Sequence, residues 1–320
     1  MIFRMHMLAH RHSAQRIKIP TGIMRLQSRQ LLTSNQSEKY CMDLVRTHDY
    51  EQFLITLFTP EFARQTVWAL KAFNVETAII RDAVTDVNIG SMRIQWWRDA
   101  IEKTFQGSAP NHPVTMSLAK SLESTRLSRM WFTKILAARE ANLRDTQHTT
   151  IADLEAYSEN TMSSLIYLHL EALGVTDVNA EHAASHSGKA IGITTALRST
   201  PFNISKQRFY LPTEIMAQHQ VVTEDIFRFG SNEHLLDAVF TIATRANDQI
   251  LTARSFSKDV PITAIPALLP LVNYRLSQIS TFITFMHTRF IRFSKLTHLC
   301  TLKHIDTGRQ LFNQSAKGQL

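Results

Sequence analysis

Apolar side chains recur at helical spacing along much of this chain, and the most regular stretch runs from Trp68 to Glu102. The apolar positions of its first half are Trp68, Leu70, Phe73, Val75, Ile79, Ile80 and Val84. This spacing, without Gly or Pro, predicts a buried helix. Thr59 is the expected N-cap of this helix and Pro60 its expected first residue. Proline suits that position because a backbone N–H there would have no hydrogen-bond partner within the helix. Asp82 and Asp86 are four residues apart near the far end, so they are predicted to share one helical face.

A second helix is expected directly after the first. Asn88, Gly90 and Ser91 are typical of a turn, and Ser91 can also cap a helix that continues to about Phe105. Trp96 and Trp97 in this helix are adjacent and therefore point in different directions. One is predicted to fill the core and the other to meet a loop or a partner.

The helical pattern continues to about residue 254. Helices are predicted at about 114–122, 129–143, 150–174 and 180–198, from 213, and at 235–254. Thr150 and Asp153 resemble a capping box, and Gly174 is a plausible C-terminal stop. Pro201 is expected to end the helix that precedes it.

The number of helix-breaking residues also favours an all-α fold. The chain has nine Gly and nine Pro among 320 residues and few alternating β-branched segments. Gly188 and Gly192 nevertheless lie inside a predicted helix, where glycine lowers helix stability. Their spacing predicts that a neighbouring helix or a ligand approaches closely at this point, and helix packing is the favoured interpretation. No repeat or low-complexity linker divides the pattern, which predicts a single domain.

Composition adds little evidence for a particular chemistry. The chain is 44% hydrophobic and 19% charged, an ordinary globular balance. Cys41 and Cys300 lie near opposite ends of the chain, outside any metal-binding spacing. This argues against a disulfide scaffold or a zinc site.

The net charge of +8 is concentrated in the first 37 residues. Six basic residues and no acidic ones occur there: Arg4, Arg11, Arg16, Lys18, Arg25 and Arg29. Such a stretch is typical of a mitochondrial transit peptide, and the alternative is a disordered basic arm. Without it the chain is nearly neutral, so the charge does not argue for nucleic-acid binding. No apolar run of about 20 residues occurs, and we expect no transmembrane helix.

The last part of the chain is basic and apolar. From Val260 to Ile305 there is no acidic residue. This segment could lie on an anionic membrane surface or form a terminal helix pair packed on the domain, and periodicity does not distinguish the two.

The order of several segments resembles the squalene and phytoene synthase family. These segments are AFNVETAIIRDAV, MRIQWWRDAIE, the helix with Tyr157, GKAIGITTALR and RFYLP. The resemblance covers roughly Tyr40 to Leu211 and continues more faintly to Arg254. The segments AFNVE, YSENTMSSLIYL, HAASHSGKAIGI and ARSF resemble a mitochondrial branch of this family. The resemblance implies an isoprenoid synthase-type helical domain at about 38–275, followed by a divergent segment at 276–320.

The family's metal chemistry provides a test of activity. Its active members carry two Asp-x-x-x-Asp motifs on facing helices, which bind Mg²⁺ and the substrate diphosphate. Alignment on the family pattern places the first motif at Ala78 and Asp82, and the second at Ser199 and Asn203. The resemblance therefore implies a relative without catalytic, cofactor-binding or metal-binding residues. Asp82 and Asp86 have the Asp-x-x-x-Asp spacing of one motif, but a metal cluster needs carboxylates from both facing helices.

Other candidate sites are less specific. His182 and His186 lie one turn apart and could bind a metal, but HAASH lacks the Glu and the third ligand of helical zinc motifs. Arg198 and Arg208 would point toward the family's diphosphate pocket, where they could hold an anion or cap carbonyls.

The resemblance implies a function in the mitochondrial matrix, at the inner membrane surface. It implies a non-catalytic role in early assembly of respiratory complex I, in the biogenesis of a membrane-embedded core subunit. The expected partners are assembly intermediates or a membrane-arm subunit. Two alternatives remain: Mg²⁺-dependent prenyl diphosphate transfer through Asp82 and Asp86, or a module that binds an isoprenoid or another lipid without turnover.

Overall fold

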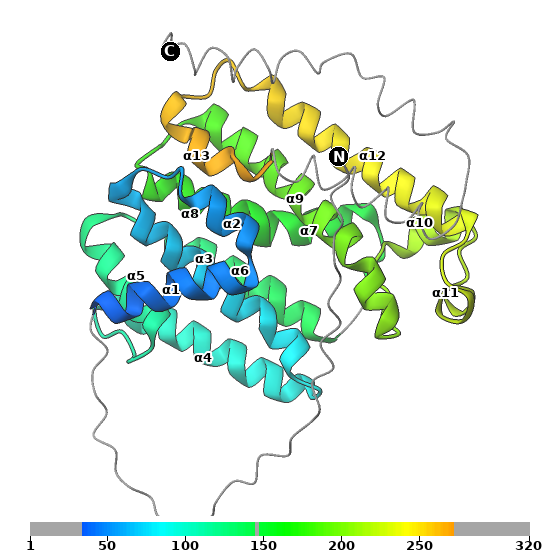
Figure 1. Cartoon of the computed structure of the whole chain (residues 1–320), viewed down its shortest axis with the longest axis horizontal. Helices are drawn as coiled ribbons and strands as arrows, with labels where there is room; N and C mark the ends of the chain where they lie inside the picture. The colour runs from blue at the N-terminus through cyan, green and yellow to red at the C-terminus, as the bar shows by residue number, and fades with distance from the viewer. Residues whose placement is uncertain (1–33, 145–146, 272–320) are drawn as a thin grey trace, which may run out of the picture. The chain divides into compact units, whose positions relative to one another are not determined.

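The computed structural model describes residues 34–144 and 147–271, which all belong to one compact unit. These residues form helices and connecting segments with no β-strand, which confirms the all-α prediction (Figure 1). The elements are α1 Ser34–His48, α2 Tyr50–Thr56, α3 Glu61–Ala83, α4 Val87–Phe105, α5 Pro113–Ser124, α6 Arg129–Ala141, η1 Asn142–Arg144, α7 Ile151–Ser158, η2 Glu159–Ser163, α8 Ser164–Ala172, α9 Val178–Ser205, α10 Thr213–Gln218, α11 Thr223–Phe229, α12 Glu233–Ser255, η3 Ile262–Ala264 and α13 Ile265–Leu268.

The larger apolar cluster is organised around α3. This helix packs against α1, α2, α4, α5, α6 and α8, and twelve of its residues are buried. The Phe73 ring lies edge-to-face against Trp97 of α4 and Phe132 of α6, with centroid distances of 5.4 and 5.2 Å. Such pairs stabilise a core beyond the area that they bury. The predicted apolar stripe is therefore the centre of the domain.

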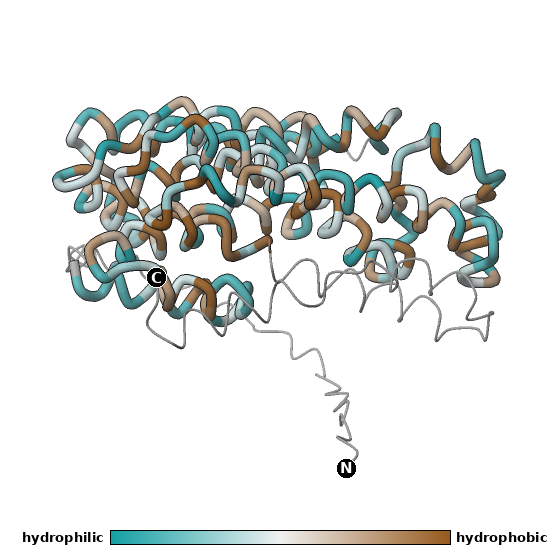
Figure 2. Tube along the Cα trace, turned by 90° about the horizontal axis from the view of Figure 1, so that it is seen from above, coloured by the Kyte–Doolittle hydropathy of each residue, from teal (hydrophilic) through white to brown (hydrophobic). Residues whose placement is uncertain are grey.

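A second apolar cluster lies around α9 and α12, which pack side by side (Figure 1). Its fully buried side chains include Ile193, Leu211, Leu235 and Ile242. Hydrophobic positions recur along the helices between hydrophilic ones, as an amphipathic helix requires (Figure 2).

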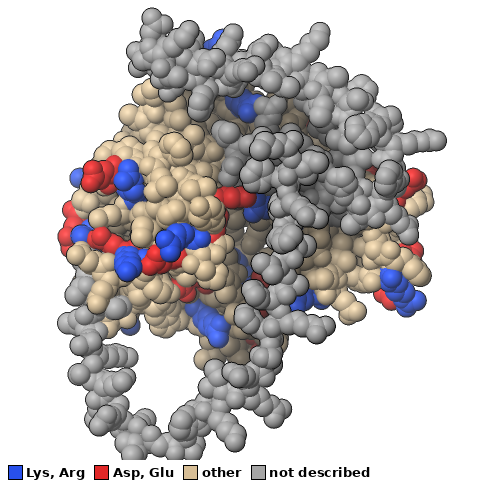
Figure 3. Space-filling view, viewed as in Figure 1, with Lys and Arg blue, Asp and Glu red and all other residues tan. Residues whose placement is uncertain are grey.

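Charged side chains of both signs are interspersed on the described face that is visible in Figure 3. Some form ion pairs between helices, as Lys120 of α5 does with Glu38 of α1 at 2.7 Å. No helix in the described ranges is long and apolar enough to cross a membrane.

Two predicted helix boundaries are confirmed. Thr150 and Asp153 form the capping box that opens α7, each side chain accepting from the other residue's backbone N–H. Gly174 follows α8 with φ of +70°, a left-handed conformation that glycine adopts at low cost. Between them the chain is not one α-helix, because the π-helical turn η2 separates α7 from α8.

Two other predicted boundaries are wrong. Thr59 does not cap α3; its hydroxyl lies 3.3 Å from Nε2 of buried His169, and Pro60 is the N-cap residue instead of the first helical residue. Pro201 does not end α9, which continues to Ser205. Leu197 and Ile204, on either side of the proline, pack in the same apolar cluster, and this packing outweighs the lost hydrogen bond.

The predicted close approach at the two glycines of α9 is confirmed. A Cβ atom at Gly188 would overlap the backbone and hydroxyl of Ser163, and one at Gly192 would overlap Ser158. The neighbouring segment is the chain from α7 through η2, so a helix rather than a ligand occupies this position.

Substituting Gly188 tests this packing. Gly188→Ala should lower the free energy of unfolding by at least about 2 kcal/mol, because the added methyl meets backbone atoms that cannot rotate away. The measurement is urea unfolding followed by circular dichroism. Gly90→Ala in α4 is the matched control, because the added methyl meets only the side-chain ends of Leu143 and Val84 at 3.1 and 3.2 Å. A loss at Gly188 no larger than that at Gly90 would contradict the tight contact.

Candidate functional site

Asp82 lies in the last turn of α3 and Asp86 precedes α4, so the prediction that they share a helical face is wrong. α3 ends at Ala83, and Val84 is extended. Asp86 is the N-cap of α4, where its Oδ1 accepts from the backbone N–H of Asn88 at 2.7 Å. α4 accordingly begins at Val87, and Asn88, Gly90 and Ser91 lie inside it rather than in a turn.

Asp82 is linked to the chain that follows α9. Its Oδ1 lies 3.5 Å from Nη1 of Arg208, and both side chains are partly exposed. The neighbouring Arg81 guanidinium lies 3.8 Å from the centre of the Tyr210 ring. These two contacts bring the end of α3 next to the segment that follows the second candidate motif.

The second candidate motif is neutral and internally bonded. Ser199 and Asn203 lie one turn apart on α9, and the Asn203 amide donates to the Ser199 hydroxyl at 3.1 Å. Ser199 in turn donates to the carbonyl of Ala196 at 3.0 Å. Ala78, at the remaining motif position, is exposed on α3.

The two arginines expected near an anion pocket pair with carboxylates. Arg208 contacts Asp82, and Arg198 of α9 lies 2.9 Å from Glu51 of α2. Each pair joins α9 or its C-terminal extension to an earlier helix. Both pairs are solvent-accessible, so each contributes at most about 1 kcal/mol.

His182 and His186 lie against an aromatic ring rather than against other metal-ligand types. Both imidazoles stack on Phe256, with centroid distances of 5.7 and 6.3 Å. Nδ1 of His186 also lies 2.6 Å from Oε1 of Gln249 in α12. In the described ranges no three His, Cys, Asp or Glu side chains are grouped as metal ligands would be.

Two polar side chains from other parts of the chain interact electrostatically with the buried Lys71. Asp49 caps α2, Lys71 projects from α3, and His169 comes from α8. Burial lowers the pKa of Lys71 to about 8 and that of His169 to about 3, and it raises the pKa of Asp49. All three shifts disfavour charge, so desolvation outweighs the attraction between Lys71 and Asp49.

The Cys41 thiol is also buried, in contact with Ser117 at 3.5 Å. Burial raises its pKa to about 11, which makes it an unreactive core thiol. Cys300 lies outside the described residues.

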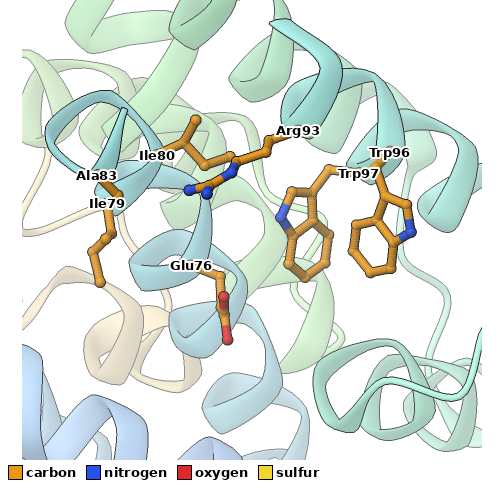
Figure 4. A pocket seen from close by; sticks show the side chains of 7 residues that line it. All are labelled: Glu76, Ile79, Ile80, Ala83, Arg93, Trp96 and Trp97. Atoms are coloured by element: carbon orange, nitrogen blue, oxygen red, sulfur yellow. The ribbon is translucent and has the colours of Figure 1, made fainter. Parts of the chain in front are cut away.

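A pocket of about 280 Å³ lies between α3 and α4, and the sequence did not predict it (Figure 4). Its lining residues are Glu76, Ile79, Ile80, Ala83, Arg93, Trp96 and Trp97. Trp97 is buried, whereas Trp96 is exposed and contacts His112, the N-cap of α5, which confirms the prediction for this pair. The exposed tryptophan was the only sequence signal for this pocket.

The fold is that of the isoprenoid synthase class. A dehydrosqualene synthase structure superposes with a TM-score of 0.67 at 18% identity, covering 80% of this chain and 97% of the other. Squalene synthase HpnC from Alicyclobacillus acidocaldarius gives 0.68, also at 18% identity, with 80% and 95% covered. At this level of identity the similarity concerns the fold alone.

The chain belongs to the squalene/phytoene synthase family, whose sequence profile matches residues 45–277. Relatives called "NADH dehydrogenase (ubiquinone) complex I, assembly factor 6" are 44% identical in Rattus norvegicus, over 74% of this chain and 71% of theirs. The Drosophila melanogaster homolog is 38% identical over 70% and 69%. A 15-cis-phytoene synthase from Synechococcus elongatus is 22% identical over 62% and 68%. The predicted family and its mitochondrial branch are thus confirmed.

The capping role of Asp86 can be separated from a metal-binding role. Asp86→Ala should lower the free energy of unfolding by about 1 kcal/mol, whereas Asp86→Asn should preserve it because Asn also caps helices. Chemical denaturation of both variants measures the difference. Equal losses in the two variants would show that the side chain's charge, not its capping bond, supports the structure.

Lys71 should make stability depend on pH in the alkaline range. The pKa of Lys71 is about 8 in the folded protein and 10.5 when the side chain is not buried, as in the unfolded chain. Between these two pH values the unfolded chain therefore binds more protons than the folded protein. Stability should therefore rise from pH 8 to pH 10.5, by about 3 kcal/mol at about 1.4 kcal/mol per pKa unit.

Lys71→Met is the matched control for this dependence, because it removes the titrating amine and leaves the other groups in place. Urea unfolding of both proteins across this range gives the comparison. Parallel stability curves for the two proteins would refute the assignment to Lys71.

Proposed function

We propose that this protein is a non-catalytic factor in the assembly of mitochondrial respiratory complex I. The observation that carries the proposal is the identity of 44% over 237 residues with a relative that bears the assembly factor name. Relatives with synthase names are more distant, at 22% identity. We place its action at an early stage, in the biogenesis of a membrane-embedded core subunit, as the family resemblance implies.

The contacts of the candidate motifs support a role without metal chemistry. The Arg208 guanidinium lies 3.5 Å from one oxygen of the Asp82 carboxylate, and its positive charge disfavours a divalent cation beside it. Asp86 is directed to the first turn of α4, and Ser199 and Asn203 offer a hydroxyl and an amide instead of carboxylates. None of these arrangements favours a divalent cation.

The proposed location is the matrix side of the inner membrane, with peripheral membrane contact. The basic N-terminal segment supports import, and most of it lies outside the described residues. α1 already begins at Ser34, and Ser37 is buried. A transit peptide that ends before Ser34, rather than at residue 37, would leave this helix intact. The predicted segment 276–320 lies outside the described residues, and an isoprenoid or lipid ligand stays a prediction.

Deletion and complementation test the proposal. Cells that lack this protein should have less complex I on native gels and should turn over newly made membrane-arm subunits faster. The wild-type chain and Asp82→Ala should restore complex I equally, because Asp82 forms only an exposed ion pair. Normal complex I in the deleted cells would refute the assembly role.

An enzymatic assay tests the non-catalytic part separately. Purified protein incubated with farnesyl diphosphate and Mg²⁺ should yield no condensation product. Turnover that Asp82→Ala abolishes would establish the prenyl transfer alternative instead.

A further inference from the structure

The pocket between α3 and α4 is built from two aligned rows of side chains. Glu76, Ile79, Ile80 and Ala83 occupy successive turns of one face of α3. Arg93, Trp96 and Trp97 face them from α4, and Figure 4 shows the Arg93 guanidinium beside Ile80 with the two indole rings next to it. The pocket is thus a local widening of the groove between two neighbouring helices.

Apolar side chains extend the pocket into a larger exposed surface. They are Ile79 at 38% exposure, Ile89 at 48%, Met92 at 72% and Trp96 at 44%. Ile89, Met92 and Trp96 follow at helical spacing on α4, so they form one exposed stripe on this helix, which meets the pocket at Trp96. Exposed contiguous apolar surface of this kind marks interaction sites, and Trp, Met and Arg are enriched where proteins bind each other. We call this surface, from Ile79 to Trp96 with Arg93, the α3–α4 groove.

The charge available in the groove is positive. Arg93 is exposed and forms no ion pair or side-chain hydrogen bond with any residue in the described ranges. The Glu76 carboxylate, by contrast, is already engaged, since it accepts from the Tyr40 hydroxyl at 2.6 Å and lies 4.0 Å from Nε2 of His112. A molecule that binds in the groove therefore contacts aromatic and aliphatic side chains around the Arg93 guanidinium.

We propose that the α3–α4 groove binds a helical segment of a partner protein that carries an apolar face and one carboxylate. The apolar side chains would cover Met92 and Trp96, with one of them in the pocket. The carboxylate would pair with Arg93, whose planar donors suit bidentate binding. A groove between two helices accepts such an amphipathic helix along its length.

Charge excludes two other occupants of the groove. The chain's own segment from 276 onward carries no acidic residue before Asp306, so it would place cations next to Arg93. An anionic lipid surface would meet the exposed Asp86 carboxylate where α3 and α4 join. This proposal adds a docking surface to the proposed assembly role. It rests on that role only because the test is carried out in mitochondria.

Photo-crosslinking in mitochondria tests the groove. The full-length chain would carry the photoreactive residue p-benzoylphenylalanine in place of Met92, and mass spectrometry would sequence the crosslinked peptide. The expected product joins position 92 to a protein segment with apolar residues at helical spacing and an Asp or Glu among them. Arg93→Glu should reduce its yield at least tenfold, whereas Arg93→Lys should retain most of it. Changing the partner's acidic residue to Arg should restore the yield with Arg93→Glu.

Phe62 provides the matched position control. Its exposure of 71% is close to the 72% of Met92, but it lies in the first turn of α3, away from the groove. A crosslinker there should give no product that depends on Arg93, and unchanged melting temperatures would show that the Arg93 variants are folded.

Several outcomes would overturn the proposal: no crosslink at position 92, a crosslink to residues 276–320, to a second copy or to lipid, or a yield unaffected by Arg93→Glu. Complex I levels in the same cells distinguish the two proposals. A complex I defect upon deletion, together with a failed crosslink, would reject the groove and keep the assembly role.

Discussion

The close contact between α9 and the segment from α7 to α8 determines how the described helices fit together. Gly188 and Gly192 lack the side chains that would keep Ser163 and Ser158 away. α9 supplies buried residues to both main apolar clusters: Ala180, Ala184 and Ile191 to the first, and Ile193 and Leu197 to the second. The contact therefore fixes the position of one cluster relative to the other. It also positions the end of α3 next to the segment after α9, where Asp82 pairs with Arg208.

The π-helical turn at this contact serves packing. Its Glu159 carboxylate accepts from the hydroxyls of Ser163, Ser185 and Tyr167 at 2.9, 2.8 and 2.7 Å, and Lys189 lies 3.7 Å away. Burial, reinforced by Glu159, raises the pKa of Tyr167 above its ordinary value, so the phenol remains a neutral donor. π-Helical turns often occur at functional sites, but the hydrogen bonds of this one are directed within the domain. The polar groups here hold α8 and α9 in register.

The sequence was sufficient for the long helices but not for the short α11 and α13 or for every break between helices. Periodicity located α3 and most of the later helices, and local chemistry located the capping box at Thr150 and the stop at Gly174. It could not show that the chain becomes extended at Val84, because an apolar residue there continues the helical pattern equally well. That single break decides whether Asp82 and Asp86 share a face, and the Asp86 cap at the start of α4 follows it. The groove beside Trp96 was missed for a similar reason, since it requires two helices to be placed together.

Charged and polar side chains near the ends of α3 and α9 pair with one another within the chain. Carboxylates gathered on two facing walls repel each other unless a metal ion lies between them. In this chain a cation of the same chain, Arg208, lies beside the Asp82 carboxylate. Ser199 and Asn203 satisfy each other by a neutral hydrogen bond that needs no counter-ion. The Asp82–Arg208 pair and the Ser199–Asn203 hydrogen bond therefore satisfy these positions within the chain itself.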